Sequence, residues 1–400
     1  EMEDAMEEFL SLLREARLGL RSEVREVDFA KLFVLGLQHD VVALLYDQLY
    51  RFPNFPEDLQ PQWKKMAIRT NAIQAMKSDR FVRLYRRFLE ADLKVLVLKG
   101  IVCRSLYPKP DNRPSNDEDL YVRKEDSARA EQIMVEDGFQ VANRSAEVTT
   151  LLDTASGLSI EMHTTLFSEK SQAYGSYQRF FADAFAHPAV HQIMGCDIYS
   201  LSHAQHMLFL IMHFVKHFLH GGVGIRQVLD IIMYAERFGT EIDWPHLYAV
   251  LEEEHVLTLS ENVFAIAVDH LGFDVSRITL PEGIDLSALD YEDLLDDIVA
   301  AGLFGKSSKE REHSSTITLN AAADGKRTLR KTLFPSVSDL SGKYPYLKDH
   351  PWMLPRAWGS RIFHYLSDRD QGSAKGAVEL GNRRVELLRK YKVIAEELKG

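Results

Sequence analysis

The triplet Asp117-Glu118-Asp119 combines residue types and a spacing that could hold a metal ion. The alternation of side chains predicts a strand over 117–122, on which residues two apart project to the same face. Asp117 and Asp119 would then lie close together, and two such carboxylates repel unless a divalent cation or a proton lies between them. An exposed surface strand is the alternative, because 59 acidic residues among 400 produce several acid-x-acid triplets by chance.

Lys99 and Gly100 stand between a predicted strand and a predicted helix. The short apolar run at 95–98 is bounded by charges, which is typical of a buried strand, and residues 101–107 follow as a predicted helix. Glycine lets the backbone approach a ligand closely, and a helix N-terminus offers N–H groups suited to phosphate. We therefore expect Lys99 and Gly100 to contact phosphate, and an ordinary strand-to-helix turn is the alternative.

Arg113 lies four residues before Asp117, in a loop that Pro108, Pro110 and Pro114 enforce. A guanidinium at this position could bind a phosphate through two parallel hydrogen bonds, or it could neutralise the acidic pair. The sequence leaves both roles open.

Glu161 is an acid on an otherwise apolar predicted strand over 158–166. Its face also carries His163, whereas Ile160 and Met162 take the other face. An acid at such a position is costly to bury without a partner. If this strand pairs beside 117–122, three carboxylates converge, and with water and phosphate oxygens they complete one octahedral Mg²⁺ site, or two that share ligands.

Ionisable residues after 201 form two pairs with helical spacing. His213 and His217 have the i, i+4 spacing of a zinc pair, but Phe214 stands where a metalloprotease needs glutamate, so core packing or the lining of a substrate site is favoured. Arg226 and Asp230 lie one turn apart. They are typical of an ion pair on a helix surface, and a role at the mouth of the site is equally open.

These residues are distributed over three regions of the chain. Apolar residues recur at three- and four-residue spacing through the first region, residues 1–91, which predicts helices. Residues 92–200 alternate between short apolar runs and helical patterns, which predicts a small mixed α/β domain. From 201 onward the pattern is helical again. The predicted elements of the second and third regions are strands at 95–98, 117–122, 139–142, 148–152 and 158–166, helices at 101–107, 124–137, 201–219, 224–238, 244–254 and 257–271, an exposed loop at 306–315, and a largely helical remainder at 319–399.

The long helix predicted over 62–91 carries basic side chains opposite its apolar face. A solvated basic face is favoured, and a wall around an anionic ligand is the alternative. The basic residues are Lys77, Arg80, Arg83 and Arg87.

Composition narrows the classes of protein. Of the 400 residues, 46% are hydrophobic and 27% charged, which excludes a disordered or fibrous chain. A net charge of −11 argues against a protein dedicated to coating DNA or a membrane surface. Cys103 and Cys196 cannot form a disulfide framework. The apolar stretches are too short to span a bilayer and residues 1–8 are acidic, so we expect no membrane association and a cytoplasmic location.

Several motifs together are similar to those of one known family. Leu98-Lys99-Gly100, Tyr107-Pro108, Arg113-Pro114, Asp117-Glu118-Asp119-Leu120 and Val122 resemble the central motif of the bacterial uncharacterised nucleotidyltransferases, within the polymerase-beta-like nucleotidyltransferase superfamily. Gly138-Phe139 and Ile160-Glu161-Met162-His163 resemble its next two blocks. His213, His217 and the Arg226–Asp230 pair resemble its helical blocks, and segments 334–336 and 354–355 also look similar. The resemblance extends from about residue 30 to about residue 370.

The resemblance implies an α+β fold, with a small mixed-sheet polymerase-beta-like nucleotidyltransferase core at 92–200. An N-terminal helical region (1–91) and a C-terminal helical domain (201–400) would flank this core. The implied reaction moves a nucleoside monophosphate from an NTP to a hydroxyl or phosphate acceptor and releases pyrophosphate. Two Mg²⁺ (or Mn²⁺) ions would assist it.

The resemblance also implies roles for single residues. Asp117 and Asp119 would bridge both metal ions, and Glu161 would complete the ion nearest the acceptor. Most members of the superfamily have Gly-Ser or Gly-Gly at Lys99-Gly100, so Lys99 would replace that serine in binding phosphate. The remaining implied roles are phosphate contacts for Gly100, Arg113 and Arg226, and the lining of the acceptor site for His163, His213, His217 and Asp230.

Two other functions fit the same residues. One is a nucleotide-binding module that has lost turnover and acts through partner contacts. The other is nucleotide addition to RNA 3′ ends, which the basic residues from Lys77 to Arg87 and from Lys326 to Lys331 favour and the net charge opposes. The expected partners are an NTP and an acceptor that is either a small molecule or a macromolecule. The sequence does not indicate the oligomeric state.

Overall fold

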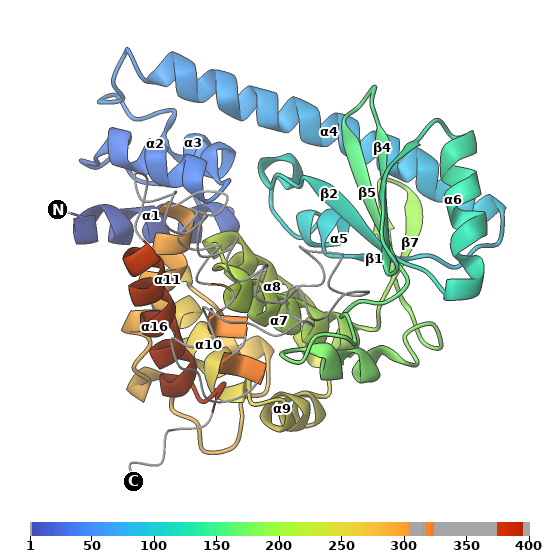
Figure 1. Cartoon of the computed structure of the whole chain (residues 1–400). Coiled ribbons are helices and arrows are strands. Elements are labelled where there is room, and N and C mark those ends of the chain that lie inside the picture. Colours follow the sequence, from blue (N-terminus) through green and yellow to red (C-terminus); the bar gives the residue numbers. More distant parts are fainter. Residues whose placement is uncertain (1, 304–314, 316, 320, 324–373, 395–400) are drawn as a thin grey trace, which may run out of the picture.

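The computed structural model describes residues 2–303, 315, 317–319, 321–323 and 374–394. The predicted loop at 306–315 and most of the helical remainder after 319 lie outside these residues, as do Lys326–Lys331 and the segments at 334–336 and 354–355. Figure 1 shows a sheet on one side of the molecule and most of the helices on the other, with the long helix α4 (Gln60–Glu90) extending from one to the other.

The N-terminal region is helical, as its periodicity predicts. Its elements are α1 (Met2–Arg17), α2 (Phe29–Gln38), α3 (Val42–Leu49) and α4. The apolar stripes of α1 and α3 are buried against each other and against Trp63 of α4. The Asp28 side chain accepts the Lys31 N–H at the start of α2, and Pro61 opens α4, so both helices begin with residues suited to a helix N-terminus.

The central sheet is mixed, with the strand order β1-β2-β5-β4-β3. Strands β2 and β5 run parallel, and every other neighbouring pair is antiparallel. The prediction of a small mixed sheet is confirmed, and the strand that carries Glu161 does pair beside the strand that carries Asp119. The strands are β1 (Leu96–Leu98), β2 (Asp117–Tyr121), β3 (Gln140–Arg144), β4 (Val148–Asp153) and β5 (Leu158–His163).

Short helical elements connect these strands, at the positions predicted for helices except for the 3₁₀ turn at 110–112, which lies in the predicted proline-containing loop. They are α5 (Gly100–Arg104), the 3₁₀ turns η1 (Pro110–Asn112) and η2 (Lys124–Asp126), and α6 (Ser127–Glu136). Helix α4 also contacts the region that contains the sheet. Arg80, in the C-terminal half of α4, forms an ion pair at 2.6 Å with Asp137, the residue that follows α6. Long-range contacts of this kind fix α4 relative to the sheet.

A hairpin of β6 (Ala189–Ile193) and β7 (Cys196–Ser200) follows the 3₁₀ segment η3 (Gly175–Phe181) and was not predicted. Its turn residues Met194 and Gly195 both have positive φ, and methionine is an unusual choice there, so the sequence lacks the usual Asn-Gly signal. The hairpin is attached to the core through Tyr85 of α4. The Tyr85 hydroxyl donates to the Val95 carbonyl (2.7 Å) and accepts the Tyr199 N–H (2.9 Å).

The C-terminal region is helical where the structure describes it. The four helices predicted between 201 and 271 are confirmed within a few residues. They are α7 (His203–His220), α8 (Ile225–Phe238), α9 (Trp244–Glu253) and α10 (Leu257–Leu271), and they are followed by α11 (Glu292–Leu303) and α16 (Ala374–Lys390). Both cysteines are free and buried. In the described ranges, no helix combines the length and the apolarity that a membrane span requires.

Candidate functional site

Three side chains on one face of the sheet bring potential metal ligands together. The parallel pairing places Asp119 of β2 directly beside Glu161 of β5, and His163 lies two residues further along the same face. The His163 Nε2 atom is 2.9 Å from Asp119 Oδ1 and 3.6 Å from Glu161 Oε2. One ligand atom from each of these three residues lies within 4.8 Å of the other two.

This donor set fits a divalent cation. Two carboxylates and an imidazole suit a first-row ion such as Mn²⁺, and Mg²⁺ would use the carboxylate oxygens. The sequence predicted that Asp117, Asp119 and Glu161 would hold the metal. The group within ligand distance contains His163 instead of Asp117, although Asp117 shares the face of β2 with Asp119. The described residues contain one such group of potential metal ligands, Asp119, Glu161 and His163. The presence of two metal ions therefore stays a prediction.

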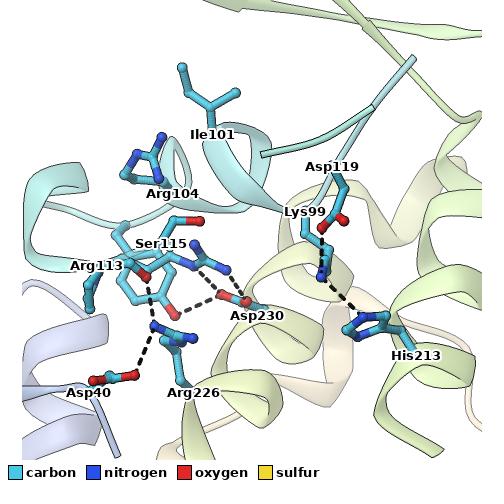
Figure 2. A network of polar contacts seen from close by, with 12 residues as sticks. Asp40, Lys99, Ile101, Arg104, Arg113, Ser115, Asp119, His213, Arg226 and Asp230 are labelled. Atoms are coloured by element: carbon cyan, nitrogen blue, oxygen red, sulfur yellow. Dashed lines mark hydrogen bonds and ion pairs between the residues drawn. The ribbon is translucent and has the colours of Figure 1, made fainter. Parts of the chain in front are cut away.

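Lys99 contacts the carboxylate oxygen of Asp119 that His163 does not contact. Its Nζ atom is 2.8 Å from Asp119 Oδ2 and 3.1 Å from His213 Nε2 on α7, as Figure 2 shows. Its backbone has φ 47° and ψ −117°, a conformation that side-chain-bearing residues rarely adopt. The fold therefore holds Lys99 in a strained position beside Asp119, as is common at functional sites.

A buried histidine holds the strained backbone of Lys99. The Lys99 N–H donates to His206 Nε2 at 3.0 Å. Since Nε2 accepts, the neutral imidazole carries its proton on Nδ1 and donates to Ser200 Oγ at 2.8 Å. Burial lowers the pKa of His206 well below its usual value, which keeps the ring in this neutral form.

The carboxylates of the site differ in their affinity for protons. Burial opposes the ionisation of Asp119, but Lys99 and His163 outweigh it and hold the pKa of Asp119 far below its usual range. Burial and the charge of Asp119 raise the pKa of Asp117 and of Glu161. Two carboxyl groups with raised pKa beside a third with lowered pKa indicate a site suited to additional positive charge.

Glu118, the middle acid of the triplet, faces the opposite side of β2 and caps helix α5. Its Oε2 accepts the Ile101 N–H at 2.7 Å, and its Oε1 pairs with Arg104 Nη2 at 2.6 Å. A Cβ on Gly100 would lie 1.8 Å from Glu118 Oε2. The sequence analysis expected a phosphate to lie against the backbone of Gly100, and in the structure the Glu118 carboxylate lies there. Phosphate binding by Gly100 stays a prediction.

Arg113 is paired with Asp230 and is not directed at the carboxylates. Its Nε and Nη2 atoms donate to the two oxygens of Asp230 at 2.8 and 2.5 Å, and the Tyr107 hydroxyl donates to the same carboxylate at 3.0 Å. All three side chains are buried, and Figure 2 shows the contact between Arg113 and Asp230. Neither of the two roles left open for Arg113 accounts for this pair, which fastens the loop before β2 to α8.

Arg226 also binds this loop. Its Nη1 atom donates to the Pro114 carbonyl at 2.7 Å and lies 3.9 Å from Asp40 Oδ2 (Figure 2). The ion pair between Arg226 and Asp230, one of the two alternatives, is not formed. Both residues project from α8 toward the loop, where Arg113 binds the Asp230 carboxylate. Neither Arg226 nor Asp230 is brought to the Asp119 group.

Helix α7 contributes a lysine that the sequence reasoning missed. Lys216 is half-buried, and its pKa is lowered by burial and by the charge of Lys99, while Asp119 and Glu161 raise it. Within the described part of the chain Lys216 has no ion pair or hydrogen bond, and it lies 5.8 Å from the centre of the Tyr174 ring. A signal existed, because Lys216 is the one Asp, Glu, Lys or Arg among the 18 residues of α7.

The two predicted histidines of α7 lie next to Lys99. The Nε2 atoms of His213 and His217 are 3.1 Å apart. Burial and the charge of Lys99 lower the pKa of both rings, that of His217 to about 3, so both are neutral at pH 7. No third potential ligand joins them among the residues that the structure describes, and zinc hydrolysis gains no support.

Comparison with known proteins gives one result. The sequence model of a family described as uncharacterised nucleotidyltransferase matches residues 25–272. This range includes the whole sheet, helices α7 and α8, and every site residue described above. Neither the search of curated proteins nor the search of solved structures finds a match.

Proposed function

Because this chain belongs to the family of uncharacterised nucleotidyltransferases, we propose that it moves a nucleoside monophosphate from an NTP to a hydroxyl or phosphate acceptor. Family membership supports nucleotidyl transfer as the general activity. The observation that supports the metal-dependent form of this reaction is the cluster of Asp119, Glu161 and His163, with Lys99 and Lys216 around it.

The proposed reaction breaks a phosphoanhydride bond of the NTP and forms a phosphoester with a hydroxyl acceptor, or a new phosphoanhydride with a phosphate acceptor. An acceptor oxygen forms a bond to the α-phosphorus, the bond from that phosphorus to the β-phosphate bridging oxygen breaks, and pyrophosphate leaves. A hydroxyl acceptor releases its proton to solvent. Asp119, Glu161 and His163, joined by Asp117, would hold a divalent cation that polarises the acceptor oxygen and offsets phosphate charge.

We assign the triphosphate to Lys99 and Lys216. Both ammonium groups lie within electrostatic range of the carboxylates, and Lys216 forms no ion pair within the described residues. Arg113 and Arg226 are already engaged by Asp230 and the Pro114 carbonyl, so we do not assign them to phosphate. His213 and His217 are assigned to the lining of the acceptor site because they border Lys99 on α7.

We assign the metal, phosphate and acceptor contacts to different regions of the chain. The α/β core at 92–200 would carry the metal and Lys99, and the C-terminal helical domain at 201–400 would supply Lys216 and the acceptor side. The N-terminal helical region at 1–91 would support both.

The basic side chains of α4 do not favour RNA as the acceptor. Arg80 pairs with Asp137 and Asp153, Arg83 with Asp79, and Arg87 with Glu90 and Asp137. These ion pairs offset the charge that would attract a polyanion. We therefore propose an acceptor other than an RNA end.

Calorimetric titration with each of the four NTPs, in Mn²⁺ or in EDTA, tests the function. We expect one NTP to bind the wild-type protein only with metal, and Asp119→Asn to lose this binding while its circular dichroism and melting temperature show a folded chain. Asp79→Asn, which removes an exposed carboxylate of α4, is the matched control. Metal-independent binding, or unchanged binding by Asp119→Asn, would contradict the site. Binding without pyrophosphate release in the presence of candidate acceptors would favour the inactive module.

A further inference from the structure

The ammonium group of Lys99 rests on the carboxylate that the proposed function assigns to a metal ion. Resting on that function, we infer that Lys99 is an exchangeable counter-ion of the site. It neutralises Asp119 when no metal is bound, and it moves to the triphosphate of the nucleotide when a divalent cation takes Asp119.

Both oxygens of Asp119 have partners within the chain. Oδ2 contacts Lys99 Nζ at 2.8 Å, and Oδ1 contacts His163 Nε2 at 2.9 Å. Carboxylate oxygens bind Mg²⁺ at about 2.1 Å, closer than they bind an ammonium group. A cation on Oδ2 and the ammonium of Lys99 would therefore occupy the same small volume with like charges, so Lys99 must leave Oδ2 for a metal to bind there.

The charges of the site explain why a lysine rests at this position. Asp117, Asp119 and Glu161 are three acids on one face. Among the described residues, Lys99 and Lys216 interact electrostatically with Asp119 and Glu161, and Lys77 interacts with Asp117. Without Lys99 the buried Asp119 would lose its ammonium partner, and removing one partner of a buried ion pair is costly.

The geometry of Lys99 lets its side chain move while its backbone stays fixed. The backbone N–H is held by the buried His206, and the Lys99 carbonyl accepts the Cys103 N–H at 2.9 Å within α5. The side chain is unbranched and 20% exposed, whereas that of Asp119 is 9% exposed. The neutral ring of His213, 3.1 Å from Nζ, offers a second acceptor that adds no charge. The ammonium can thus leave Asp119 and remain in the site.

This exchange predicts that metal and triphosphate assist each other. Metal binding releases Lys99 from Asp119 and makes it available to phosphate, and phosphate holds Lys99 away from Asp119 and makes the carboxylate available to metal. By linkage, each ligand raises the affinity of the other by the same factor.

The first test is the affinity for Mn²⁺ alone, measured by electron paramagnetic resonance and calorimetry. We expect Lys99→Met to bind Mn²⁺ about tenfold more tightly than the wild-type protein, because the competing ammonium is gone. The matched control is Lys216→Met, which removes one positive charge from the same site but leaves the contact between Lys99 and Asp119 intact. We expect this control to raise the affinity only about twofold, by relief of longer-range repulsion.

The second test uses tripolyphosphate, the part that all NTPs share. Saturating Mn²⁺ should increase the affinity of the wild-type protein for tripolyphosphate, after correction for the binding of Mn²⁺ to tripolyphosphate in solution. Lys99→Met should lose this increase in affinity. Lys99→Gly repeats both measurements in a variant that removes the side chain and relieves the positive φ, so it guards against a folding defect in Lys99→Met.

The outcomes separate the exchange from the proposed function. Equal or weaker Mn²⁺ binding by Lys99→Met and Lys99→Gly, or an equal gain in Lys216→Met, overturns the exchange. If Asp119→Asn still abolishes metal-dependent NTP binding in that case, the proposed function stands alone. If neither the wild-type protein nor any variant binds Mn²⁺ or tripolyphosphate, both proposals are wrong.

Discussion

Arg113 and Asp230, 117 positions apart in the chain, form a buried ion pair through two hydrogen bonds. The pair joins the loop that leads into β2 to helix α8, and the Tyr107 hydroxyl completes it. Since β2 carries Asp117 and Asp119, this contact positions the start of the acidic strand relative to the helices. It is a structural contact at a residue for which the sequence left open a phosphate contact or neutralisation of the acidic pair.

Removal of the Arg113 guanidinium should destabilise the fold. We expect Arg113→Met to lower the free energy of unfolding by about 3–5 kcal/mol, because Asp230 then stays buried without its cation. The double variant Arg113→Met/Asp230→Leu should recover much of this loss, and denaturant titration measures both. A stable Arg113→Met protein that fails to bind tripolyphosphate would instead support the phosphate-binding role.

Glu118 and Asp119 are adjacent, but their substitutions should have opposite consequences. Glu118→Gln leaves Arg104 buried without a carboxylate, so we expect a loss of about 3 kcal/mol in unfolding free energy and Mn²⁺ affinity within about twofold of wild type. Asp119→Asn should lose Mn²⁺ binding at a smaller cost in stability, because the freed Lys99 reaches solvent. Chemical denaturation and Mn²⁺ titration of both variants test the contrast, which fails if Glu118→Gln alone loses the metal.

Gly100 should tolerate no side chain. In Gly100→Ala the new Cβ would collide with the Glu118 carboxylate, and the positive φ adds strain, so we expect a loss of about 3 kcal/mol or more in stability. Gly157→Ala is the matched control, because Gly157 also has positive φ but open space around its Cβ position. There we expect a loss of about 1 kcal/mol. Equal melting temperatures for the two variants would show that Glu118 does not require the glycine.

Triphosphate binding should weaken at alkaline pH because of Lys216. Burial and Lys99 lower the pKa of Lys216 below the usual 10.5, so this ammonium loses its proton, and its attraction for phosphate, at a lower pH than an ordinary lysine does. The pKa of Lys99 is raised, chiefly because Asp119 outweighs burial, so Lys99 stays charged over the same range. Tripolyphosphate affinity measured from about pH 7 to pH 10 should therefore fall as the pH rises.

Two variants isolate the contribution of Lys216 to this pH dependence. Lys216→Arg keeps the charge without the titration, so its affinity should stay nearly constant with pH. Lys216→Gln should bind about tenfold more weakly at pH 7 and show no further decline. If Lys216→Arg declined in parallel with the wild-type protein, another group would be responsible.

The sequence alone identified the features that depend on local periodicity. Period-two alternation placed Asp117 and Asp119 on one face of a strand, and the apolar spacing of the helices located α4 and α7 to α10. The motifs from Leu98 to Val122 indicated the family that the later comparison found. These inferences hold because residues close in the chain determine strand faces, helix faces and motif spacing.

Only the tertiary structure decided which charges meet. Asp230 is one turn from Arg226 in the chain, yet it binds Arg113, and Glu118 binds Arg104 beneath Gly100 because β1 and β2 pair side by side. Lys216 belongs to the site because α7 lies beside Lys99, which His206 and His213 of the same helix contact. The affinity of two opposite charges depends on their distance and burial, and both quantities are set by contacts between segments far apart in the sequence.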